Sequence, residues 1–276
     1  MRLFNKVAII GTGLIGGSLA LVIKKNGLAR EVVGVARHKV SLDLALKMKA
    51  IDRGSLSLGI IKGADLIILA TPIDLIISQR NRLLKIVSND CIVTDVGSTK
   101  GKIVSFLEKD FKNYIGSHPL AGSEKRGIKN ARRDIFKESV CILTPTKRTR
   151  KLALEKIKRL WLTAGARVIL LSPEAHDNAL SFTSHLAHIV AFSLINSIPS
   201  SLLKLSSGGL RDTTRIASSS PELWPSIFLT NAKNTLKAVA VFEKNLNKIK
   251  IAIRNNDKKS LTDILRQAQK KRTLIE

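Results

Sequence analysis

Histidine is scarce in this sequence, and its positions mark the segments where an imidazole could do chemistry. Five histidines occur among 276 residues, and three of them lie in one long apolar segment, 172–196. His118 instead falls in the glycine-flanked stretch 116–124, directly after a strand-like pair of residues. An imidazole titrates near neutral pH and can accept a proton. We therefore predict that His118 is a general base at the carboxyl edge of a sheet, where open α/β sheets bind ligands. The alternative is a structural histidine in a turn.

A polar stripe runs along the apolar segment 172–196. Asp177, Ser181, Ser184 and His188 are spaced by 4, 3 and 4 residues, so they share one face of a helix, with His185 beside them. Polar side chains inside an apolar helix need hydrogen-bond partners, because burying them alone is costly. The stripe therefore predicts either a substrate site or an internal hydrogen-bond network. No third ligand has a clear spacing to His185 and His188, so we expect no metal.

A cluster of arginines follows a glycine break further along the chain. Residues 208–215 have the sequence GGLRDTTR, in which Arg211 and Arg215 flank Asp212. The guanidinium group of arginine is planar and permanently charged, and it can form two hydrogen bonds to one carboxylate. The cluster therefore predicts a binding site for an acidic substrate, although Arg211 and Asp212 could equally form an internal ion pair.

A glycine-rich loop near the amino terminus indicates a dinucleotide site. Residues 11–17 have the sequence GTGLIGG and follow the apolar run Val7–Ile10. In this pattern Gly11 permits a tight turn, Gly13 lets the backbone approach a pyrophosphate, and Gly16 allows close packing of helix on strand. The phosphates then meet the positive end of the helix. We predict that the cofactor contacts come from Gly11, Thr12, Gly13, Leu14, Ile15 and Gly16, and from Thr71 and Pro72 after a later strand.

The residue that follows the second strand bears on the choice between NAD and NADP. An acidic residue there would bind the ribose hydroxyls of NAD. This sequence instead has Arg37, followed by a histidine and a lysine. A basic residue favours a 2′-phosphate and so favours NADP slightly. In a chain with 47 basic residues, however, Arg37 could also simply stack on adenine.

The elements that must position these residues alternate along the first part of the chain. Buried strands are predicted at Val7–Ile10, Val32–Ala36, Leu66–Ala70, Ile92–Val96, Val140–Leu143 and Arg167–Leu171. Amphipathic helices lie between them at Leu14–Lys25, Ser41–Lys49, Leu75–Val87 and Leu152–Ala164. We therefore predict an α/β fold, in which a Rossmann-like doubly wound parallel sheet over residues 1–171 precedes an all-helical domain over residues 172–276.

Composition narrows the classes of protein that fit. The net charge of +26 is spread over both halves of the chain, whereas nucleic-acid binders concentrate basic residues in a patch, often with interleaved aromatics. A role in nucleic-acid binding is therefore a remote alternative, and a basic field would also attract a small anionic substrate. No uninterrupted apolar run approaches the roughly 18 residues that a membrane span needs. We see no targeting segment, and two cysteines without C-x-x-C spacing favour a cytoplasmic protein.

The ordered motifs resemble those of the prephenate/arogenate dehydrogenases. The resemblance comes from GTGLIGGSL at 11–19, TDVGSTK at 94–100, GSHPLAGSEK at 116–125, SPEAHD at 172–177, SHLAH at 184–188, RDTTRIA at 211–217 and PELW at 221–224. Two departures stand out: Ala187 replaces a proline that often separates the two histidines, and Leu210 replaces an aromatic residue. His188, which some arogenate-specific relatives lack, is present and favours prephenate.

The resemblance implies an oxidative decarboxylation of prephenate, or alternatively of arogenate, in tyrosine biosynthesis. It implies a homodimer built through the helical domain, and feedback control by tyrosine is conceivable. It also implies that His118 accepts the proton of the ring hydroxyl while Ser98 orients that group. The implied substrate-binding residues are Arg215, Ser184, His185, His188, Arg211, Ser123, Glu124 and Trp224. A dehydrogenase of the hydroxyisobutyrate type is a weaker alternative, because its catalytic lysine motif is not found.

Overall fold

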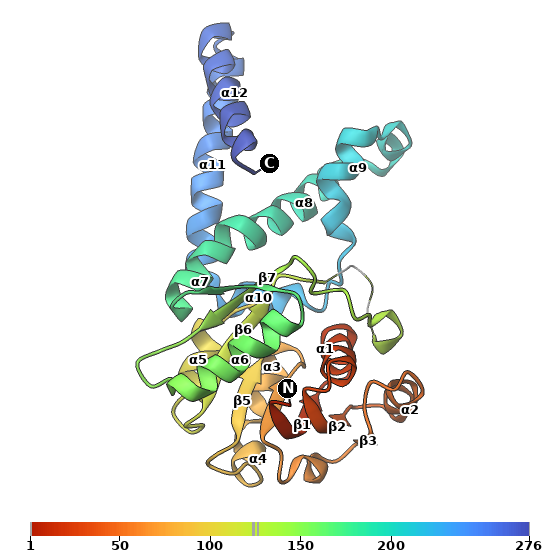
Figure 1. Cartoon of the computed structure of the whole chain (residues 1–276). Coiled ribbons are helices and arrows are strands. Elements are labelled where there is room, and N and C mark those ends of the chain that lie inside the picture. The colour runs from red at the N-terminus through yellow and green to blue at the C-terminus, as the bar shows by residue number, and fades with distance from the viewer. Residues whose placement is uncertain (1, 123–124, 126, 276) are drawn as a thin grey trace. The chain divides into compact units, whose positions relative to one another are not determined.

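The computed structural model describes residues 2–122, 125 and 127–275. Its centre is a sheet with the strand order β3-β2-β1-β4-β5-β6-β7-β8 (Figure 1). The strands are β1 (Phe4–Ile10), β2 (Ala29–Val35), β3 (Arg53–Ser55), β4 (Leu66–Leu69), β5 (Ile92–Asp95), β6 (Tyr114–Pro119), β7 (Val140–Thr144) and β8 (Arg167–Leu170). The order reverses at β1, so β1 and β4 flank the switch point at which open α/β sheets bind ligands.

The predicted parallel α/β sheet is confirmed, with one antiparallel pairing. All neighbouring strands are parallel except β6 and β7, which pair His118 with Ile142 and Pro119 with Cys141. This pairing extends β6 beyond the two residues predicted as strand. His118 therefore lies in the sheet near the carboxyl end of β6 rather than in a turn, and the sheet fixes its backbone.

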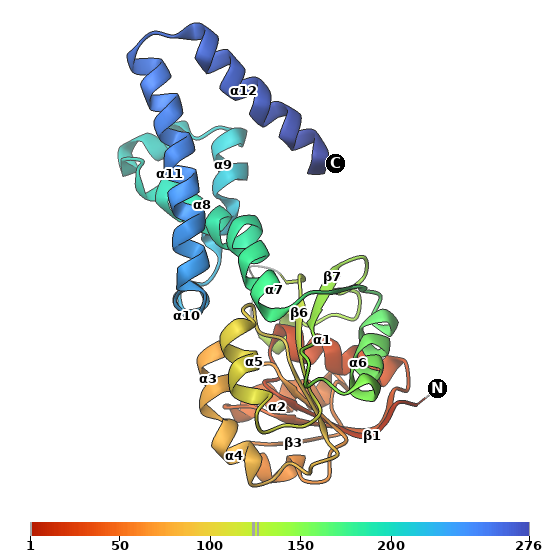
Figure 2. The same cartoon turned by 90° about the vertical axis from the view of Figure 1, so that its left-hand side faces the viewer.

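Helices cover both faces of the sheet (Figure 2). One face packs against α1 (Leu14–Lys25), α2 (Lys39–Lys47) and α6 (Lys151–Thr163). The other packs against α3 (Ile73–Ser78), α4 (Arg80–Leu84) and α5 (Gly101–Leu107), together with η1 (Leu58–Ile61). Each face has its own aliphatic core, as expected for strands that are buried on both sides. The short η2 (Ile128–Asn130) lies beside α1.

A long helical segment follows β8 and carries the predicted polar stripe. It consists of α7 (Pro173–Leu180), the π-helical turn η3 (Ser181–His185) and α8 (Leu186–Asn196). The Ser172 side chain caps it by accepting a hydrogen bond from the Ala175 backbone at 3.1 Å. Along this segment Ser181 and His185 are buried, while Ser184 and His188 are partly exposed. Shorter helices follow at η4 (Ser200–Leu205), α9 (Gly208–Thr214), η5 (Arg215–Ser218) and α10 (Trp224–Thr230).

The segment Pro173–Asn196 has 24 residues and contains an 18-residue window with a mean hydropathy of 1.3, so its length and composition alone would suit a membrane span. Core helices of soluble proteins meet the same criterion. Asp177 and His185, both buried, also lie along it.

The chain divides into two compact units, residues 1–231 and 232–276. The first unit contains the sheet and the helices up to α10, so it includes residues 172–231, which the sequence analysis assigned to the second domain. The second unit is a pair of helices, α11 (Ala232–Arg254) and α12 (Lys258–Arg272), followed by η6 (Thr273–Ile275). Asp257 caps α12 by accepting a hydrogen bond from the Ser260 backbone at 2.9 Å. A domain boundary near residue 171 stays a prediction.

Candidate active site

Two cavities of about 610 and 500 Å³ open at the carboxyl edge of the sheet. Ser98 and His118 line both, so the two cavities adjoin at these side chains. Ser98 comes from the loop after β5, and His118 comes from β6. A ligand in one cavity and a ligand in the other would therefore meet beside a hydroxyl and an imidazole.

The second cavity has the features of a dinucleotide site. Gly11 has a φ of +101°, and a Cβ there would lie 2.5 Å from the Ala70 carbonyl oxygen. A Cβ on Gly13 would meet nothing within 4 Å, so the backbone faces open space at the start of α1. The first turn of α1 has no side-chain cap and no acidic residue. The exposed amide groups and the helix dipole therefore suit a pyrophosphate.

Most residues predicted to bind the cofactor lie at this cavity. Those that line it are Gly13, Leu14, Ile15, Thr71 and Pro72. Thr12 lies in the same loop, and its hydroxyl and that of Thr71 are buried without a hydrogen-bond partner among the described residues. Arg37 is exposed just beyond the end of β2 and is not among the residues that line the cavity. The glycine loop thus fits a dinucleotide.

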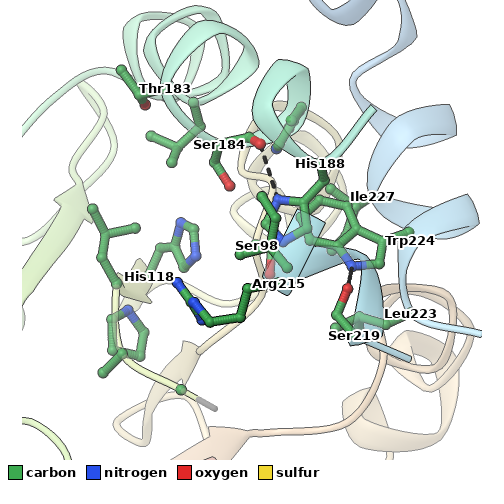
Figure 3. A pocket seen from close by; sticks show the side chains of 17 residues that line it. Ser98, His118, Thr183, Ser184, His188, Arg215, Ser219, Leu223, Trp224 and Ile227 are labelled. Carbon is green, nitrogen blue, oxygen red and sulfur yellow. Dashed lines mark hydrogen bonds between the residues drawn. The ribbon is translucent and has the colours of Figure 1, made fainter. Parts of the chain in front are cut away.

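The first cavity gathers most of the residues predicted to bind substrate (Figure 3). Its lining includes Ser98, His118, Ser184, His185, His188, Arg215 and Trp224. Figure 3 shows the side chains of His118 and Arg215 extending into the same space. Arg211 is exposed on α9 and is not among the lining residues. Ser123 and Glu124 lie outside the described residues.

An aromatic stack forms one wall of the first cavity. The rings of His188 and Trp224 have centroids 3.6 Å apart at an angle of 30°. The His188 Nδ1 lies 3.0 Å from the Ser184 carbonyl oxygen, and the Trp224 indole N–H donates to the Ser219 hydroxyl at 2.8 Å. The Ser184 carbonyl can only accept, so Nδ1 of His188 carries the hydrogen. Its Nε2 is then the atom available to a ligand.

Behind His118, hydrogen bonds connect three side chains. The His118 Nδ1 lies 2.8 Å from the His176 Nε2, and the His176 Nδ1 lies 2.8 Å from the Asp177 Oδ1. The Asp177 carboxylate also accepts from the backbone N–H of Lys100 at 2.7 Å and of Gly101 at 2.8 Å. Asp177 therefore joins α7 to the start of α5 and holds the loop that carries Ser98.

A buried ion pair lies next to this network. The Lys100 ammonium contacts the Asp95 carboxylate, and neither side chain is exposed to solvent. Asp95 also accepts from the Gly97 backbone at 2.8 Å and from the Tyr114 hydroxyl at 2.6 Å. These bonds satisfy the buried carboxylate and fix the 95–100 loop from beneath.

The electrostatic environment keeps the histidines of the site neutral. Burial lowers the pKa of His118 well below its usual value, and electrostatic interactions with His176, Lys100 and His185 lower it further. Burial likewise lowers the pKa of His185 to about 4. A neutral imidazole is a proton acceptor, so His118 suits the role of a base near neutral pH.

Sequence reasoning did not assign site roles to His176, Lys100 or Asp95. Their motifs, SPEAHD and TDVGSTK, are part of the family resemblance, but the partners lie far apart in the chain. Among the described residues, no group of three or more His, Cys, Asp or Glu side chains is placed to hold a metal ion.

Comparisons with known proteins agree with this geometry. The chain matches the model of the prephenate dehydrogenase nucleotide-binding domain over residues 19–170 and that of its dimerization domain over residues 172–267. A prephenate dehydrogenase from Bacillus subtilis is 35% identical over 268 residues, covering 93% of this chain and 72% of that protein.

Two crystal structures extend the comparison to the whole fold. Prephenate dehydrogenase from Aquifex aeolicus, in complex with hydroxyphenyl propionate and NAD+, is 36% identical with a TM-score of 0.94, covering 99% of this chain and 98% of that chain. The arogenate dehydrogenase of Synechocystis is 29% identical with a TM-score of 0.86, covering 98% of this chain and 100% of that chain.

Proposed function

This chain belongs to the prephenate dehydrogenase family and is a nicotinamide-dependent oxidoreductase, and on that premise we propose that its substrate is prephenate. The product would be 4-hydroxyphenylpyruvate, the precursor of tyrosine. The observation that carries the proposal is the meeting of two cavities at Ser98 and His118, with Arg215 in the wall of the first. An assay of reduced nicotinamide formation with prephenate tests it.

The proposed reaction assigns one task to each side chain. The nicotinamide, when bound, accepts a hydride from the ring carbon that bears the hydroxyl. His118 takes the hydroxyl proton through Nε2, and Ser98 orients that hydroxyl. Arg215 pairs with a substrate carboxylate. As carbon dioxide leaves and the ring becomes aromatic, His118 can return the proton to the new phenolic oxygen, so protons balance over the cycle.

Charge supports prephenate over arogenate, the second candidate. Prephenate carries two carboxylates and a keto group, whereas arogenate carries an ammonium group on its side chain. None of the described residues that line the first cavity is acidic, while Arg215 is cationic. Among the residues that the structure describes there, an ammonium group would find no carboxylate. The arogenate alternative is favoured by the likeness to the Synechocystis enzyme.

Removing the Arg215 guanidinium should weaken substrate binding. A hydrogen bond to a charged group contributes about 1.5–3 kcal/mol, so Arg215→Ala is expected to raise KM about 10- to 100-fold while kcat changes less. Steady-state kinetics with varied prephenate measures both constants. Arg211→Ala is the matched comparison, because it removes the same charge from the preceding turn. If KM rises 10- to 100-fold in Arg211→Ala and does not rise in Arg215→Ala, the carboxylate contact belongs to Arg211 instead.

We further propose a preference for NADP over NAD, carried by Arg37. The expected interaction is a charge-assisted bond to the 2′-phosphate at the end of β2. Arg37→Asp is expected to lower the ratio of kcat/KM for NADP to that for NAD by at least about tenfold, since one such bond contributes about 1.5–3 kcal/mol. Arg30→Asp, at the opposite end of β2, makes the same charge change away from the site. A ratio that is unchanged in Arg37→Asp, or lowered equally in both variants, would remove Arg37 from cofactor recognition.

We also propose that the chain acts as a cytoplasmic homodimer. Support for the dimer comes from the match to a dimerization domain and from large apolar side chains that a single chain leaves exposed, among them Leu205 and Leu246. Support for the compartment comes from Cys91 and Cys141, which are buried free thiols.

A further inference from the structure

The ring of His118 is the first member of a hydrogen-bonded chain that leads away from the cavity to His176 and Asp177. Neither of these two residues lines the cavities, and their side chains are 0% and 6% exposed. We propose that His176 and Asp177 are positioning residues that hold His118 in the tautomer able to act as a base and share the positive charge it acquires. The inference rests on the proposed role of His118.

The donors and acceptors available on each side chain determine the direction of both hydrogen bonds between His118, His176 and Asp177. The ionised Asp177 carboxylate has only acceptors, so His176 Nδ1 must carry a hydrogen. A neutral His176 then has its lone pair on Nε2, and the short contact requires His118 Nδ1 to be the donor. A neutral His118 therefore has no hydrogen on Nε2. That nitrogen is the one free to take a proton in the cavity.

The state of Asp177 supports this direction. Burial by itself raises the pKa of Asp177, but hydrogen bonds from His176 and from the Lys100 and Gly101 backbones outweigh it and lower the pKa. The carboxylate is thus ionised at neutral pH. A protonated Asp177 could not serve, because its hydroxyl would compete with His176 for the role of donor.

The chain also provides a route for charge. When the substrate hydroxyl breaks its O–H bond, the proton binds His118 Nε2 and creates an imidazolium. The Nδ1 proton of His118 can then shift across the 2.8 Å contact to His176 Nε2, which moves the cation next to the Asp177 carboxylate. No proton leaves the protein, and the reverse shift restores His118 as the phenolic oxygen is reprotonated.

Several charged or titratable groups lie near His118 and affect the stability of its protonated form. Interactions with Lys100 and His185 lower the pKa of His118, and the cationic Arg215 lines the same cavity, whereas Asp177 raises the pKa of His176. Asp95 is paired with Lys100, and Cys141 on β7 has a pKa raised by burial, so its thiol stays neutral. Asp177 is therefore the anion positioned to offset the surrounding positive charge through His176.

A direct test reads the tautomer without turnover. The protein has five histidines, so a sample with isotope-labelled imidazole rings gives few NMR signals. Variants in which one histidine at a time is replaced assign each signal to its residue. At pH 7 we expect His118 to carry its hydrogen on Nδ1. In Asp177→Asn, an NH2 group in place of Oδ1 would give up the bond from the Lys100 backbone and donate to His176 Nδ1, which reverses both rings and places the His118 hydrogen on Nε2. A wild-type His118 protonated at Nε2 would overturn the proposal.

Kinetics provide the second readout. With the wrong tautomer, Asp177→Asn is expected to lose about 10²- to 10⁴-fold in kcat with little change in KM. The acid limb of kcat/KM should move to lower pH, because the imidazolium loses its nearby carboxylate. A merely structural Asp177 predicts the opposite, since a loosened site admits water and raises the histidine pKa toward its usual value. That upward shift, with a raised KM, would overturn the proposal.

Two further variants complete the design. Asp110→Asn removes a carboxylate paired with Arg80 just beyond the other end of α5, and it should leave kcat unchanged. His176→Gln keeps Asp177 and its backbone bonds, and its amide oxygen can still accept from His118. It should preserve the His118 tautomer but retain less activity than wild type, because an amide cannot take up the proton. If the wild type is inactive on both substrates, the proposed function fails, while the NMR result still decides the tautomer.

Discussion

Replacing His118 by asparagine is expected to lower kcat by at least about 100-fold, the usual effect of removing a general base. The physical reason is that asparagine can hydrogen-bond the ring hydroxyl but cannot take its proton. His118 is 8% exposed and lies in β6, so the sheet should hold the new side chain in the same place. Single-turnover formation of reduced nicotinamide measures the effect on the chemical step.

Two controls separate lost chemistry from lost structure in His118→Asn. Cofactor affinity, measured by fluorescence titration, and the thermal midpoint should both stay close to wild type. If turnover remains near normal while prephenate is still oxidised, another group must act as the base. The site would then need reassignment around Ser98 or His188, which line the same cavity.

The largest expected effect on stability follows from the buried ion pair beneath the site. Lys100→Met leaves the Asp95 carboxylate without its cation in a fully buried position. Breaking such a pair from one side typically costs about 3–5 kcal/mol. The hydrogen bonds from Gly97 and Tyr114 remain, but they cannot neutralise the charge. Urea unfolding at a fixed protein concentration measures the loss in the free energy of unfolding.

Lys102→Met is the matched control for Lys100→Met. Lys102 is exposed on α5 and loses the same charge, so its change should stay within about 0.5 kcal/mol. Equal stability of the two variants would mean that Asp95 is neutral or rehydrated in the folded protein. The ion pair would then not be what holds the 95–100 loop.

The sheet and its helices were largely predictable because their patterns are local. Helix α1 begins and ends where the sequence analysis placed it, since the glycine loop fixes its start and its apolar pattern runs to Lys25. β3 was missed because three residues, Arg53–Ser55, are too few to show alternation. The length of β6 was underestimated because its last residues are strand only through pairing with β7, a contact that no local pattern reveals.

The parts of the candidate site that could be predicted are those in which the residue types of a local motif suit one chemical task. The glycine loop, His118 and Arg215 each have residue types suited to one task, and the fold brings His118 and Arg215 to one cavity. His176 could not be assigned in the same way, because its contact with His118 spans 58 positions in the chain. The π-helical turn at Ser181–His185 has no local sequence signal either, and within it Ser181 and His185 are buried.

The measurement that tests the central claim most directly is the initial rate of nicotinamide reduction by the purified protein. It compares prephenate with arogenate, each with NADP and with NAD, and identifies the products by mass spectrometry. The account predicts that prephenate gives the highest kcat/KM, with release of carbon dioxide and formation of 4-hydroxyphenylpyruvate. A folded protein that binds the cofactor but oxidises neither compound would contradict it.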